Sequence, residues 1–121
     1  MKWSLGFLVV LMMLAGCTAT KLMLPSDPVR LTIVQRQAKA IPGSRGTIKV
    51  KLEDITGRQV LLSVRGALGQ PILDTVSVRK GDVVDFELGG QRYYLKVIEL
   101  KNFLMGDDFG VFELSSSPPT K

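Results

Sequence analysis

Apolar and polar residues alternate through most of the stretch from residue 29 to residue 114, which is the pattern of half-buried β-strands. In TIKVKL, Ile48, Val50 and Leu52 alternate with two lysines, so every second side chain would face a common core. No helical period is sustained, although QRQAKA (residues 35–40) is compatible with a short helix that the nearby proline would limit. The period of two recurs at residues 29–33, 60–64, 72–78, 84–88, 91–100 and 110–114.

Turn-forming residues separate these stretches. The Gly89-Gly90 pair between DFEL and QRYYLKVIEL is the clearest hairpin signal, because two-residue hairpin turns favour glycine. Further turns are indicated by ITG (55–57), GALGQP (66–71), RKGD (79–82) and GDDFG (106–110). Six or seven short strands at this spacing predict an all-β domain over residues 29–114, either a small antiparallel sandwich or a barrel.

The start of the chain has a different pattern. Lys2 gives a positive start, residues 5–14 (LGFLVVLMML) are apolar, and two small residues precede Cys17, the only cysteine. The apolar stretch is too short for a transmembrane helix, which needs about 20 apolar residues. Residues 1–16 are therefore predicted to be a cleaved export signal.

The stretch LAGC (residues 14–17) resembles the lipobox of bacterial lipoproteins. The resemblance covers residues 1–20 and implies cleavage before Cys17, a diacylglyceryl group on its thiol and acylation of the new amino terminus. Two or more acyl chains give stable membrane anchoring without a spanning helix. Thr18 differs from the aspartate of inner-membrane retention signals, so we expect an outer-membrane protein facing the periplasm.

The segments on either side of the domain differ from it in composition. Residues 17–28 contain two prolines and no regular period, which predicts a lipid-anchored tether. Residues 115–121 (SSSPPTK) are predicted to be a disordered tail. No family is recognised for residues 29–114.

The charge is moderately basic and unevenly distributed. The chain carries 16 basic and 11 acidic residues, and loss of Lys2 with the leader leaves 15 basic residues and a net charge of +4, too few for a nucleic-acid partner. Residues 21–51 hold seven basic residues and a single acid, Asp27. A basic segment beside a lipid anchor could contact anionic head groups or peptidoglycan, but we favour solvated strand faces.

Residue types restrict the possible chemistry. The absence of histidine and of a second cysteine excludes Ser-His-Asp and Cys-His catalysis and zinc sites built on those residues. Carboxylates remain, at Asp82, Asp85, Glu87 and the Asp107-Asp108 pair, and they could serve a glycosidase or hold calcium. Acids on a water-facing strand or in a glycine turn are ordinary structural choices, so we expect no catalytic residue, metal site or cofactor.

Apolar residues in unusual positions indicate a binding surface instead. The stretch QRYYLKVIEL is apolar on both faces, with Tyr94, Ile98 and Leu100 predicted to face away from Tyr93. The connecting segment that follows is rich in apolar side chains, which is typical of protein interfaces, although it could also close one end of the core. The candidate partner-binding residues are Tyr94, Phe103, Leu104, Met105 and Phe109.

These observations favour a lipid-anchored, non-catalytic module that binds or assembles another envelope protein. Its membrane contact would be the acylated Cys17. The alternative is an envelope inhibitor or exclusion factor, bacterial or prophage-encoded, that blocks a foreign enzyme or phage. An enzyme that uses carboxylates on wall polysaccharide is a weaker alternative.

Overall fold

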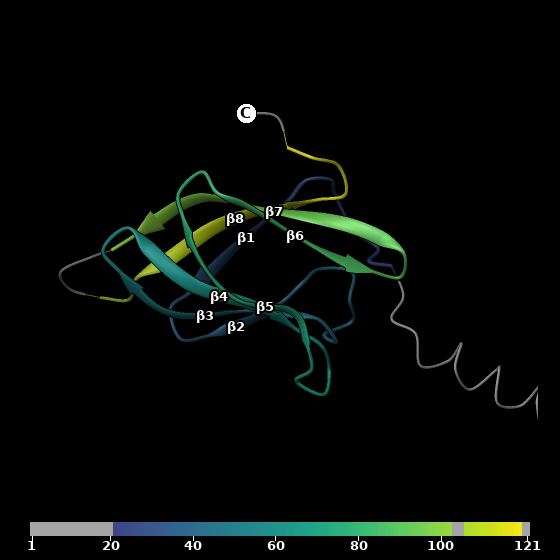
Figure 1. Cartoon of the computed structure of the whole chain (residues 1–121), viewed down its shortest axis with the longest axis horizontal. Coiled ribbons are helices and arrows are strands. Elements are labelled where there is room, and N and C mark those ends of the chain that lie inside the picture. The colour runs from purple at the N-terminus through teal and green to yellow at the C-terminus, as the bar shows by residue number, and fades with distance from the viewer. Residues whose placement is uncertain (1–20, 103–105, 120–121) are drawn as a thin grey trace, which may run out of the picture.

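Two β-sheets pack face to face in this protein (Figure 1). The computed structural model describes residues 21–102 and 106–119, and these residues form eight strands and no helix. No helix in this part of the chain is therefore long and apolar enough to cross a bilayer. The strands are β1 (Val29–Val34), β2 (Ala38–Ala40), β3 (Lys49–Thr56), β4 (Gln59–Arg65), β5 (Pro71–Arg79), β6 (Val83–Leu88), β7 (Gln91–Lys101) and β8 (Phe109–Ser115).

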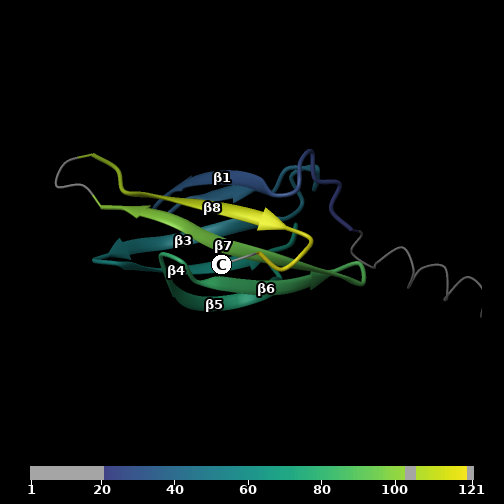
Figure 2. The ribbon, with the colours of Figure 1, turned by 90° about the horizontal axis from the view of Figure 1, so that it is seen from above.

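The two sheets are open and antiparallel. The first has the strand order β1-β8-β7-β6 and the second has the order β2-β3-β4-β5. Figure 2 shows the two layers from a second direction. The sequence prediction of a small all-β sandwich is confirmed, and the barrel alternative is wrong because the sheets do not close on each other.

The core lies between the sheets and follows the predicted alternation. On β3, Val50 and Leu52 are fully buried while Lys49 and Lys51 are exposed. The same alternation occurs on β1 and β8, where inward-facing Leu31 pairs with a fully buried Phe112. The largest fully buried side chains are Phe112, Leu31, Ile33, Ile41, Leu52, Leu62, Leu95 and Leu114.

Residues 35–40 do not form the short helix that their sequence allowed. Arg36 has a positive φ of 63°, which turns the chain, and Ala38–Ala40 form the additional strand β2 beside β3. The amide of Leu52 donates to the carbonyl of Gln37 at 3.0 Å, so pairing with β3 holds this segment extended. β2 raises the number of strands above the six or seven predicted.

A β-bulge in β7 changes which side chains face the core. The register shifts between Val97 and Glu99, so the alternation reverses there. Leu100 consequently packs against the core, and the prediction that it shares a face with Tyr94 was wrong.

The strands give the sandwich two distinct ends. We call one the entry end: it carries residues 21–28, loop 41–48, the β6–β7 hairpin and residues 115–119. The opposite end, which we call the far end, carries the β3–β4 turn, the start of β8 and Asn102, whose side chain donates to the carbonyl of Gly57 at 3.5 Å. In Figure 1 the entry end lies on the right.

The described part of the predicted tether is packed against the domain. Leu22 is buried, and its amide donates to the hydroxyl of Tyr93 at 2.9 Å. Asp27 accepts hydrogen bonds from the amide of Ser116, at 3.1 Å, and from its hydroxyl. The structure thus differs from the tether and tail predictions, because residues 22–28 and 115–116 contribute contacts to the folded domain.

Candidate functional site

The sequence-predicted binding residues lie in separate places. Tyr94 is half-buried on the outer face of the first sheet, between Asp85 on β6 and Ser115 on β8. Phe109 is half-buried at the start of β8. Four other candidates, Cys17 and Phe103, Leu104 and Met105, lie outside the described residues.

Tyr94 and Phe109 share a face but do not form one patch. Tyr94 is level with Ser115, and Phe109 lies six positions before Ser115 on β8, which corresponds to about 20 Å at the usual rise of a strand. Phe109 instead pairs with Val34 on β1 and is followed on the same face by half-buried Val111. These three side chains form a small apolar surface at the far end.

Charges on the outer face of the first sheet are matched. Arg92 donates to Asp85 at 2.7 Å and to Glu87 at 3.2 Å, and Arg30 donates to Glu113 at 2.8 Å. The hydrogen bond and the charge of Asp85 raise the pKa of Arg92. Asp85 and Glu87, two of the carboxylates considered for catalysis, therefore share one arginine.

Of the other acidic residues, Asp82 makes a local contact through its side chain and Asp108 makes one through its backbone. The side chain of Asp82 accepts a hydrogen bond from the amide of Arg79 at 2.8 Å and so closes the β5–β6 turn. Asp108 is buried, and its backbone carbonyl accepts from the amide of Gln35 at 3.0 Å. Asp107 is exposed beside it. Within the described residues, no three acidic or cysteine side chains come together in a group that could hold a metal ion.

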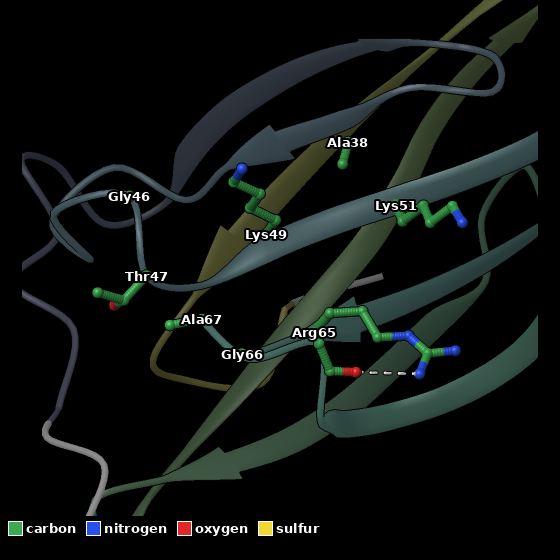
Figure 3. Close-up of a pocket in the computed structure, with 9 residues that line it drawn as sticks. Ala38, Gly46, Thr47, Lys49, Lys51, Arg65, Gly66 and Ala67 are labelled. Carbon is green, nitrogen blue, oxygen red and sulfur yellow. Dashed lines mark hydrogen bonds between the residues drawn. The ribbon is translucent and has the colours of Figure 1, made fainter.

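The outer face of the second sheet differs, because it carries an open basic groove of about 600 Å³ at the entry end. Three cationic side chains, Lys49, Lys51 and Arg65, line it, and the other lining residues are small (Figure 3). We call this feature the basic groove. Its lining residues are Ala38, Gly46, Thr47, Lys49, Lys51, Arg65, Gly66, Ala67 and Gly69.

Strand register brings the three cations together. Lys49 and Lys51 face outward because Val50 and Leu52 between them are in the core. Lys49 is directly opposite Arg65 on β4, a like-charge cross-strand pair that is unfavourable in the absence of a counterion.

Few acidic groups offset this charge. Lys51 lies 3.7 Å from Glu53, which is further along β3 and not part of the groove lining. Arg65 donates to neutral acceptors, the hydroxyl of Ser63 and the carbonyl of Gly69, both at 3.4 Å. Lys49 has no ion pair within the part of the chain that the structure describes. Of the three groove cations, only Lys51 therefore has an ion pair within the described residues.

A compact loop forms the rim of the groove. The hydroxyl of Ser44 donates to the carbonyl of Ile41 at 2.6 Å, and the amide of Ile41 donates to the carbonyl of Ile48 at 2.8 Å. The Thr47 hydroxyl donates to the carbonyl of Ser44 at 2.5 Å. These contacts hold loop 41–48 in a fixed position beside the cations.

Comparisons with known proteins add no relative. No family model matches the chain, and neither curated proteins nor solved structures give a match.

Proposed function

We propose that this protein is a lipid-anchored lipoprotein of the bacterial cell envelope that binds another envelope protein without catalysing a reaction. The anchor would be Cys17, acylated after removal of residues 1–16, and the location would be the outer membrane on its periplasmic side. The observation that carries this proposal is the separation of the two ends of the domain: the chain arrives from Cys17 at one end, and an apolar surface lies at the other.

The entry end would lie close to the lipid. Cys17 precedes Lys21, the first described residue, by four positions, and an extended chain of that length reaches about 14 Å. Leu22 is buried in the domain, so residues from Leu22 onward cannot add to this distance. The domain would therefore stay within roughly one domain diameter of the bilayer, with its far end directed into the periplasm.

The far end has the chemistry of a protein-binding surface. Val34, Phe109 and Val111 are half-buried and lie on adjacent strands of one face. Aromatic residues are enriched at protein interfaces because they bury a large area with few rotatable bonds. A partner held here would be presented away from the membrane.

The lipid anchor is tested by metabolic labelling with a fatty acid. We expect the wild-type protein to incorporate the label and the Cys17→Ser variant to lose it and to keep its leader. Labelling of the variant at the wild-type level would refute the anchor.

The binding surface is tested by crosslinking in intact cells with a photoreactive residue at Phe109. The control position is Leu68, which is 93% exposed in the β4–β5 loop at the entry end. Reproducible capture of one envelope protein from Phe109, and not from Leu68, is the expected result. Absence of capture at Phe109 would contradict the binding module and favour an inhibitor that awaits a foreign target.

A further inference from the structure

We infer that the basic groove binds the phosphate group of an anionic phospholipid, so that the entry end of the domain rests on the bilayer that holds the lipid anchor. This inference rests on the proposed function for its location. It assigns a ligand class to a surface that the binding proposal leaves unused.

The first step is the position of the groove. Gly46 and Thr47 on its rim belong to loop 41–48, and Gly43 in the same loop accepts a hydrogen bond from the amide of Met23 at 3.5 Å. The groove therefore opens beside the segment through which the chain arrives from Cys17. The groove could therefore contact the head group of a lipid in the same leaflet as the anchor while the domain keeps its described structure.

The second step is the charge. Residues 28–52 contain six basic residues and no acid, and two of the six, Lys49 and Lys51, line the groove. Within the groove, Lys49 and Arg65 are directly opposite each other. In Figure 3 the side chain of Lys49 extends in one direction, while those of Lys51 and Arg65 extend together in another. An anion between the cations would remove their like-charge repulsion.

The third step is the shape and the chemistry of the donors. Alanine and glycine at Ala38, Gly66 and Ala67 leave space between longer cationic side chains, in an open groove of about 600 Å³. A phosphate group has several acceptor oxygens and can bind a guanidinium and an ammonium at once. An open groove on the outer face of a sheet can contact a lipid head group at the membrane surface. Sites for soluble small molecules usually bury most of the ligand surface in a cleft or cavity.

The test is amine footprinting of the acylated protein reconstituted into vesicles. Acylation of lysines by a soluble reagent is measured by mass spectrometry in phosphatidylcholine vesicles and in vesicles that also contain phosphatidylglycerol. Each basic residue near an anionic surface gains about 1 kcal/mol, so we expect labelling of Lys49 and Lys51 to fall about fivefold in the anionic vesicles. Lys101, exposed at the far end, is the internal control and should keep its labelling rate.

A pair of variants separates groove binding from general attraction. Arg65→Gln removes one groove cation and should restore most of the labelling of Lys49. Arg58→Gln removes the same charge from the β3–β4 turn, about 20 Å away along β3 and beyond the screening length of about 8–10 Å, and should leave the protection unchanged.

The experiment gives different results if groove binding, the assignment to lipid or the proposed anchor is wrong. Equal labelling of Lys49 in both vesicles, or equal effects of the two variants, would overturn the inference. Protection of Lys49 by soluble glycerol phosphate on phosphatidylcholine vesicles would overturn the assignment to lipid. If the protein carries no acyl chain, the proposed anchor fails, but the footprint can still be read by mixing the protein with the same vesicles.

Discussion

Removal of a single hydroxyl at Tyr93 is expected to weaken the attachment of the N-terminal segment to the domain. Tyr93 is 2% exposed, and its hydroxyl accepts a hydrogen bond from the amide of Leu22 at 2.9 Å, across 71 residues of sequence. The same hydroxyl also contacts the carbonyl of Leu22 at 3.5 Å. In Tyr93→Phe the ring keeps its stacking on Phe86, at 5.9 Å between centroids, so the change is confined to these hydrogen bonds.

The expected loss of stability in Tyr93→Phe follows from the Leu22 amide, which loses its hydrogen-bond acceptor. Leu22 is buried, and an amide that loses its partner in a buried position costs about 1–3 kcal/mol. For a domain of about 100 residues, each kcal/mol lowers the melting temperature by about 4–8 °C. We therefore expect Tyr93→Phe to lower the melting temperature by roughly 5–20 °C.

The assay is thermal unfolding of the leaderless chain followed by circular dichroism. Tyr94→Phe is the matched control, because the Tyr94 hydroxyl has no hydrogen bond within the described residues, and its effect should stay within about 0.5 kcal/mol. Hydrogen exchange adds a local measurement: the amides of Leu22 and Met23 should exchange faster in Tyr93→Phe only. Equal melting temperatures for the two variants, with unchanged exchange at Leu22, would refute the reasoning.

Three further expectations concern the core, the entry-end loop and the leader. Leu62→Ala should lower the free energy of unfolding, measured in urea, by about 2–5 kcal/mol because Leu62 is fully buried. Leu61→Ala, at a site that is 44% exposed, should have little effect on this free energy. Similar losses of stability in the two variants would contradict the assigned faces of β4. Gly43→Ala should destabilise the protein more than Gly46→Ala, although both glycines have a positive φ. A Cβ added at Gly43 would lie 2.1 Å from the carbonyl oxygen of Met23, whereas a Cβ added at Gly46 would meet open space. Equal chemical-denaturation midpoints for the two variants would count against this packing. The mature protein should emit only tyrosine fluorescence, because Trp3 is the only tryptophan and belongs to the predicted leader; tryptophan emission from membrane-extracted protein would show that this segment is retained.

Local alternation was sufficient to predict most of the sandwich. It identified the inward faces of β1, β3 and β4, because each of these strands has one face in the core and the other in water. It missed β2, whose sequence Ala-Lys-Ala has no β-branched or aromatic residue. β2 is extended because β3 pairs with it, and that information is not local.

The basic groove could have been found only by working out the register of β3 and β4. Counting back from the turn at Gly57 pairs Lys49 with Gly66, whereas the bulge between Leu52 and Ile55 shifts its partner to Arg65. The sequence does contain the signal for this bulge: Leu52 and Ile55 both face the core, and an odd spacing between two inward residues requires an extra residue in the strand.

Other parts of the candidate site depend on long-range contacts. Burial of Leu22 and its hydrogen bond to Tyr93 join two segments with no shared sequence pattern, so local alternation placed the start of the domain at residue 29, after these packed residues. The separation of Tyr94 from Phe109 likewise depends on the pairing of β7 with β8.

The pairing of β1 with β8 also determines how the domain would resist mechanical force. β1 begins at the entry end and β8 begins at the far end, and six residue pairs from Val29–Leu114 to Val34–Phe109 join them. A pull between the lipid anchor and a partner held at Phe109 would slide these two strands along each other. The load would then be shared by all the hydrogen bonds of the pair at once, instead of opening them one after another. We therefore expect the domain to transmit tension from the proposed anchor to the proposed partner while it remains folded.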